Sequence, residues 1–151
     1  MKKRIIYIVS FFFLLLILFV SQKPFFMLYN EMTEKDAGFV DMFQVMGHGM
    51  SLDATTAGYL SAFPFLLVLI SIWLKKFPLR KLLLPYYIIA SLLVAVVFVV
   101  DMGLYPFWGF KLDASIFLYL DSPKEAMASV SLGFILVRVL AMLMLTSFYI
   151  W

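Results

Sequence analysis

Four apolar stretches, each about long enough to cross a bilayer, constrain this chain more than any other feature. A helix needs about 20 mainly apolar residues to span the hydrocarbon core. Of the whole chain, 65% is hydrophobic and 14% charged, whereas about a quarter of a soluble domain is charged. No segment shows the alternation of apolar and polar residues that would indicate a strand. The sequence therefore predicts an all-α, polytopic membrane helix bundle of about four transmembrane helices, at residues 5–21, 55–74, 82–100 and 123–151.

The N-terminus joins a basic start to the first apolar run. Lys2, Lys3 and Arg4 precede this run, as in the first two regions of a signal peptide. The small-x-small pattern of a cleavage site is missing from residues 19–24. We therefore expect an uncleaved anchor helix. It is short for a span, so tilt of the helix, extension of the Lys23 ammonium group toward the membrane surface, or continuation toward Tyr29 would make up the length.

The basic residues fix the expected orientation. One cluster lies at residues 2–4, and a second lies at residues 75–81 in the short turn between the second and third helices. The acidic residues lie in the predicted outer loops, 22–54 and 101–122, or just after them. Because Lys and Arg concentrate in cytoplasmic loops, we expect both ends of the chain inside a cytoplasmic (inner) membrane and both acidic loops outside.

The first outer loop contains a candidate amphipathic helix. Its apolar residues recur at helical spacing, and its polar residues fall on another face. Two interpretations stay open: an interfacial helix lying in the membrane surface, or an ordinary helix that packs over the mouth of the bundle. The apolar face consists of Phe39, Met42, Phe43, Met46 and Met50, and the polar face of Asp41, Gln44, His48 and Ser51.

Candidate contacts for lipid headgroups lie in the two outer loops. Trp108 belongs to an aromatic group in the second loop, and Lys111 and Asp113 follow it; His48 lies in the first loop. Tyr and Trp favour the membrane–water boundary, so an aromatic belt with solvated charges explains the same residues equally simply. His48 lacks the two or three further ligands that a metal site requires.

Arg138 is the one charged residue within the apolar run of the last predicted helix, residues 129–151. A charge at the centre of a transmembrane helix costs roughly 2.5–3.5 kcal/mol on insertion scales. Arg138 should therefore face the bundle and meet a carboxylate, Asp53 or Asp101, or a backbone carbonyl. Either it forms a structural contact, or it marks a site for lipid phosphate or a transported solute.

The sequence carries no recognisable catalytic machinery. It contains no cysteine, no glycine-rich phosphate loop, no cluster of metal ligands and no nucleophile with a base at a familiar spacing. It also contains no basic stripe that would bind nucleic acid. We predict no catalytic residue, no metal and no cofactor in this chain, and the phospholipid bilayer as its partner.

Three runs carry a resemblance to a known family: residues 48–59 (HGMSLDATTAGY), 104–115 (LYPFWGFKLDAS) and 121–131 (DSPKEAMASVS). With these runs, essentially the whole chain resembles the N-terminal transmembrane region of the lipoteichoic-acid synthase and phosphoglycerol transferase family, in its Bacteroides-type form. These proteins are sulfatase-like members of the alkaline phosphatase superfamily.

The resemblance implies five helices and then a large catalytic domain outside the membrane, with a threonine nucleophile and a divalent metal, usually manganese. None of those catalytic residues has a counterpart here, so the catalytic domain is absent from this chain. The resemblance thus implies the membrane anchor and lipid-facing module of such a transferase. The alternative hypothesis is a small independent membrane protein, a transporter subunit or an interaction partner, that uses Arg138.

Overall fold

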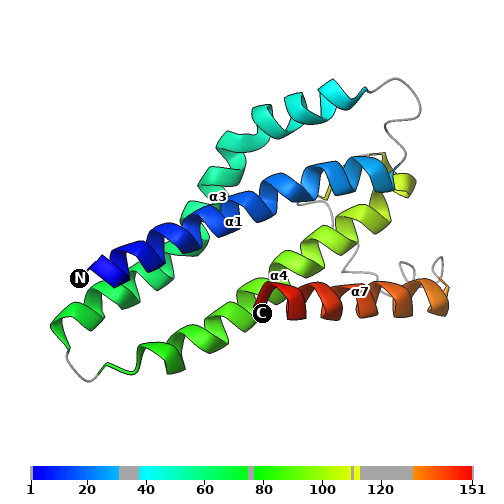
Figure 1. Ribbon diagram of the computed structural model, residues 1–151. Coiled ribbons are helices and arrows are strands. Elements are labelled where there is room, and N and C mark those ends of the chain that lie inside the picture. The colour runs from blue at the N-terminus through cyan, green and yellow to red at the C-terminus, as the bar shows by residue number, and fades with distance from the viewer. Residues whose placement is uncertain (1, 31–37, 75–76, 110, 113–130, 151) are drawn as a thin grey trace. The chain divides into compact units, whose positions relative to one another are not determined.

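The computed structural model describes residues 2–30, 38–74, 77–109, 111–112 and 131–150. Within these residues all regular structure is helical (Figure 1): α1 (Lys2–Tyr29), α3 (Phe39–Trp73), α4 (Leu79–Trp108) and α7 (Leu132–Ile150). All four are long and apolar enough to cross a membrane. The predicted all-α fold of four membrane-spanning helices is confirmed, and the chain is a multi-pass membrane protein.

Three of the helices extend well beyond the apolar runs that predicted them. α1 continues eight residues past position 21, α3 begins sixteen residues before position 55, and α4 continues eight residues past position 100. Most residues of the predicted outer loop 22–54 are therefore helical, and their place outside the membrane stays a prediction. An apolar run measures only the part of a helix that lies in lipid, whereas helical hydrogen bonding continues through polar residues at the membrane surface.

Of the helix predicted at about residues 123–151, the structure describes only the part from residue 131 to residue 150. Ser131 is not helical, and α7 begins at Leu132. The backbone N–H of Phe134 donates to Ser131 Oγ over 3.2 Å, so Ser131 satisfies an unpaired N–H of the first turn of α7. Residues 122–125, where we expected the helix to start, lie outside the described residues.

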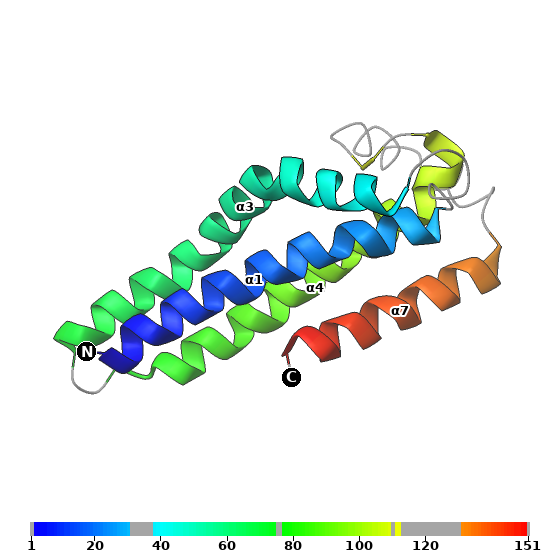
Figure 2. The same cartoon turned by 45° about the horizontal axis from the view of Figure 1, so that its top comes forward.

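The chain divides into two compact units, residues 1–86 and 87–151, and each is described by itself. In the first unit α1 and α3 pack against each other along much of their length (Figure 2). Ala57, Leu67 and Val68 of α3 are buried, while Phe13 and Ile17 of α1 are 53% and 68% exposed. Many other large apolar side chains are also exposed, as expected of a protein that is surrounded by lipid.

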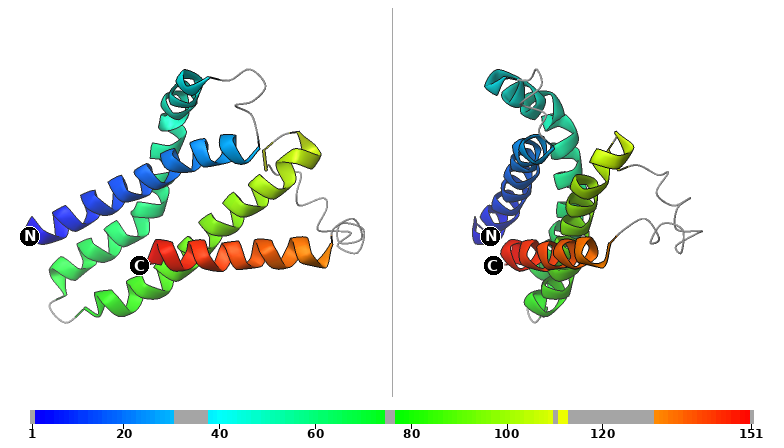
Figure 3. Two further views of the ribbon diagram at one scale, coloured as in Figure 1. Left: turned by 45° about the vertical axis from the view of Figure 1, so that its right-hand side comes forward. Right: turned by 90° about the vertical axis from the view of Figure 1, so that its right-hand side faces the viewer.

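The predicted amphipathic helix is not a separate element but the N-terminal part of α3. There the backbone N–H of Gly38 donates to Asp41 Oδ2 over 2.7 Å, at the start of the helix. This part, cyan in Figure 3, bends away from α1, and it contains Gly47 and Gly49. Glycines are a common cause of helix bending.

The exposure of this amphipathic segment differs between its residues, and its place relative to the membrane surface stays a prediction. Met42 is buried, whereas Phe39 and Phe43 are 77% and 63% exposed, with ring centroids 6.0 Å apart. One edge of the segment therefore packs against the protein, and an aromatic edge stays exposed.

A proline inside α3 explains how α4 is joined to it. Pro64 has no N–H, so it leaves the carbonyl of Leu60 without its helical donor. The hydroxyl of Tyr86, in α4, donates to this carbonyl over 2.6 Å. The ring of Tyr86 also lies against Phe63, with centroids 4.8 Å apart. Neighbouring helices commonly satisfy the backbone groups that a proline frees in lipid.

Replacing Tyr86 by Phe should therefore destabilise the protein by roughly 0.6–1.7 kcal/mol, the range of interhelical hydrogen bonds between transmembrane helices. In a Pro64→Ala background the same replacement should cost much less, because residue 64 then supplies the N–H for Leu60. Unfolding in mixed micelles at rising SDS measures both changes. Tyr59→Phe, at a tyrosine that is 77% exposed, is the matched control. Equal losses in the two backgrounds would contradict this account.

Candidate functional site

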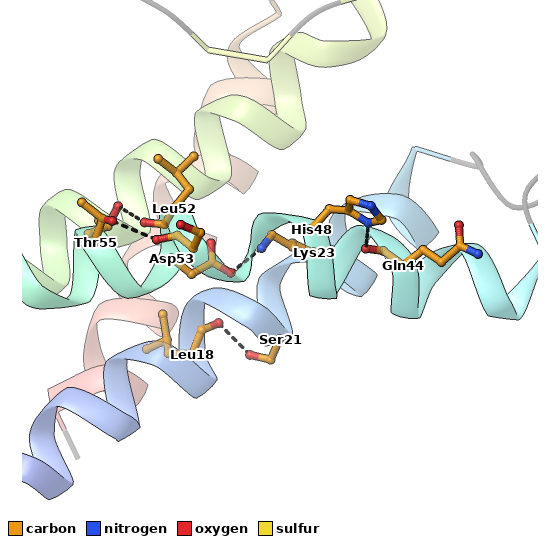
Figure 4. A network of polar contacts seen from close by, with 10 residues as sticks. Leu18, Ser21, Lys23, Gln44, His48, Leu52, Asp53 and Thr55 are labelled. Atoms are coloured by element: carbon orange, nitrogen blue, oxygen red, sulfur yellow. Dashed lines mark hydrogen bonds and ion pairs between the residues drawn. The ribbon is translucent and has the colours of Figure 1, made fainter.

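An ion pair between Lys23 and Asp53 joins α1 to α3 (Figure 4). Lys23 follows the apolar run of α1, and Asp53 precedes the apolar run of α3, so the pair marks one end of the paired spans. The two side chains are only 15% and 12% exposed. An ion pair this sheltered from water must keep both partners, because a single remaining charge would be poorly solvated.

A glycine makes room for this ion pair. A Cβ atom on Gly49 would overlap Nζ and Cε of Lys23, so the lysine side chain lies directly over the α3 backbone. Gly49 breaks the amphipathic pattern of the sequence and leaves the space that the end of the lysine side chain occupies, so a side chain here would make the end of Lys23 shift.

The other polar groups near this end serve their own helices. The hydroxyls of Ser21 and Thr55 donate to the carbonyls of Leu18 and Ser51, each over 2.8 Å. The Nδ1–H of His48 donates to the carbonyl of Gln44 over 2.8 Å (Figure 4). His48 is exposed. Its role as a headgroup contact stays a prediction, and its ring is already held by its own helix.

In the second unit, Arg138 meets α4 at another glycine. Its guanidinium carbon lies 4.3 Å from the ring centroid of Phe134, in a cation–π contact. A Cβ atom on Gly103 would lie 3.1 Å from Nε of Arg138 and 3.4 Å from Cζ of Phe134. The ring of Phe134 also meets Phe107 edge to face, with centroids 6.3 Å apart. Arg138 therefore lies in the packing between α7 and the last turns of α4.

The two carboxylates proposed as partners of Arg138 each have a partner in the structure. Asp53 pairs with Lys23, and Asp101 Oδ1 accepts the backbone N–H of Leu112 over 2.7 Å. The pairing of Arg138 with Asp53 or Asp101 stays a prediction.

The end of α4 is built by a glycine turn. Gly109 has a φ of 72°, and its N–H donates to the carbonyl of Tyr105 over 2.8 Å. Glycine is favoured here because side chains disfavour this left-handed conformation. The contact of Asp101 with Leu112 then holds the chain back against α4.

Two of the predicted headgroup contacts, Trp108 and Lys111, lie around this turn. Trp108 is the last residue of α4, and Lys111 is exposed just after the turn. The Trp108 side chain and Asp113 lie outside the described residues. Their contact with headgroups stays a prediction.

Among the described residues, these polar side chains take part in helix packing rather than in an arrangement suited to catalysis. No group of three or more His, Asp or Glu side chains that could hold a metal is found in that part of the chain. Sequence reasoning missed Lys23 as the partner of Asp53 and did not foresee the glycines under Lys23 and Arg138. No family model, curated protein or solved structure matches the chain.

Removing one member of the Lys23–Asp53 pair should destabilise the protein, by up to about 3–5 kcal/mol if the remaining charge stays buried. Replacing both, as Lys23→Met with Asp53→Leu, should restore most of the loss, because no unpaired charge then remains. SDS unfolding of the purified protein measures each variant. Lys3→Met, at an exposed lysine, is the control and should change stability by less than about 0.5 kcal/mol. Additive losses in the double variant would argue against a coupled pair.

Proposed function

We propose that this chain is the membrane anchor and lipid-facing module of an enzyme of the lipoteichoic-acid synthase and phosphoglycerol transferase type. The observation that carries the proposal is that several polar side chains of the helices contact a neighbouring helix. Lys23, Asp53, Tyr86 and Arg138 all lie in contacts between helices. Such contacts hold a bundle together in lipid, which is what an anchor requires. The three sequence runs that resemble this family give the proposal its specific form.

The chemistry of such an enzyme would belong to another domain. The described residues contain no ligand set for the manganese that the resemblance implies, and the proposal assigns that metal to the catalytic domain. The role left to the helices is to hold a catalytic domain at the membrane surface beside its lipid substrates. Exposed Phe39 and Phe43 suit contact with lipid at that surface.

The proposed orientation places the N-terminus in the cytoplasm and the Lys23–Asp53 end outside. In the first unit, the start of α1 and the start of α4 lie at the same end of the paired helices (Figures 1 and 2). Residues 2–4 are basic, and Arg80 and Lys81 open α4. Collecting basic residues at one end is what the positive-inside rule requires of the cytoplasmic side.

The first test is the size of the native gene product, on an immunoblot with an antibody against residues 38–50. The anchor hypothesis expects a band far above the 17.4 kDa of this chain, in the membrane fraction. A single band near 17.4 kDa would overturn the hypothesis and favour the independent membrane protein that uses Arg138.

The orientation can be tested directly, because the chain has no cysteine of its own. Gln44→Cys should react with a membrane-impermeant maleimide on intact spheroplasts, whereas Pro78→Cys should react only after the membrane is permeabilised. Both positions are exposed, so accessibility depends on the side of the membrane. The reverse pattern of labelling would overturn the proposed orientation.

A further inference from the structure

Basic side chains from two segments far apart in the sequence lie exposed at one end of the first unit. One group opens α1, and the other opens α4. No acidic residue occurs in residues 1–30 or 54–100. Among the residues that the structure describes, none of these cations pairs with a carboxylate. All five are exposed: Lys2, Lys3, Arg4, Arg80 and Lys81.

The pairing of α1 with α3 brings the two basic groups together. The ion pair sets Lys23 against Asp53. Farther along, α1 residues within 8–13 and α3 residues within 58–65 line one groove, so the two helices run antiparallel. Continued to its end, this alignment sets the start of α1 beside Trp73, the last residue of α3. Because α4 begins only a short turn later, its first residues lie at the same end (Figures 1 and 2).

The length of α3 places this basic end at a membrane surface. Trp73 lies twenty positions after Asp53, which is about 30 Å at about 1.5 Å per residue. The hydrocarbon core is also about 30 Å thick. With the Lys23–Asp53 pair at one surface, the basic end therefore lies at the level of the lipid phosphates of the other. Trp73 is 87% exposed there, as expected of a tryptophan at the membrane–water boundary.

The gathered cations need a compensating charge, because like charges held close together repel one another. The positive-inside rule requires basic residues on the cytoplasmic side, but it does not require the two groups to be neighbours. In the first unit the described carboxylates, Asp41 and Asp53, both belong to the other end of the paired helices. In a bilayer the anions beside the basic end are lipid phosphates, which accept charge-assisted hydrogen bonds from lysine and arginine.

We propose that this basic end is a binding site for the headgroups of anionic phospholipids. The basic start of α1 and Arg80 with Lys81 of α4 supply its cations. Phosphatidylglycerol fits this site because it carries a net negative charge, whereas phosphatidylethanolamine carries an ammonium group that neutralises its own phosphate. A bound anionic headgroup would offset the repulsion between the two groups and hold α1 and α4 at this surface. The site does not depend on the proposed function, because its cations belong to this chain alone.

The test measures which lipid surrounds Trp73 in the full chain. Trp108→Phe with Trp151→Phe leaves Trp73 as the only tryptophan, and the protein is reconstituted in vesicles of equal parts phosphatidylglycerol and phosphatidylethanolamine. One of the two lipids is brominated near the start of its acyl chains, where bromine quenches the fluorescence of a nearby tryptophan. Brominated phosphatidylglycerol should quench Trp73 more than brominated phosphatidylethanolamine does. Equal quenching by the two lipids would overturn the proposal.

Variants at the start of α4 connect this excess quenching to its cause. Arg80→Gln with Lys81→Gln should lower the enrichment of phosphatidylglycerol by up to roughly fivefold for each charge removed. Arg80→Lys with Lys81→Arg is the matched control, because it keeps both charges and should retain the enrichment. An enrichment that survives in the glutamine variant, or that is lost equally in the control, would contradict the proposal.

Salt gives a second measurement, on the protein that keeps all its basic residues, so its outcome does not depend on how a charge variant folds. Raising the ionic strength from about 0.1 M to about 1 M shortens the Debye length from about 10 Å to about 3 Å. The excess quenching by brominated phosphatidylglycerol should fall over this range. An excess that is unchanged in high salt would show that charge does not select the lipid, and the proposal would be wrong.

Discussion

Lipid offers no hydrogen bonds, and every feature of this structure follows from that constraint. A backbone group inside the bilayer must be satisfied by its own helix or by a neighbour. The free carbonyl of Leu60 below Pro64 is satisfied by Tyr86, and this contact joins α4 to α3. Most described hydroxyls return to their own helices in the same way. The hydroxyl of Ser61 is buried in α3 and has no hydrogen-bond partner among the described residues.

The same constraint explains how two cations are accommodated. Lys23 lies over Gly49 of α3, and Arg138 lies against Gly103 of α4. A residue without a Cβ leaves space for a long cationic side chain on the surface of a packed helix. Lys23 then reaches Asp53, while Arg138 covers the ring of Phe134. Both cations thus take part in holding helices together, which fits an anchor better than an open path for solute.

Hydropathy predicted the fold class well but the helix ends poorly. The apolar runs located all four helices, since the exclusion of charge from lipid acts on composition alone. They placed the start of α3 sixteen residues too late, because residues 39–54 are partly polar yet still helical. They also missed the cap at Ser131, since a serine near an apolar run does not reveal by itself whether it ends a helix. For the candidate site, the sequence singled out Arg138 and Asp53 but not the contacts they make.

By itself, the sequence determined that the chain is a multi-pass helical membrane protein and that its basic residues favour one orientation. These properties depend on how apolar and basic residues are distributed along the chain, because that distribution decides which segments enter lipid and which loops stay in the cytoplasm. Only the tertiary structure decided the partners. Lys23 and Asp53 lie thirty positions apart, and Leu60 and Tyr86 twenty-six. Whether such residues meet depends on the rotation of each helix about its axis and on where glycines allow close approach, which packing alone fixes.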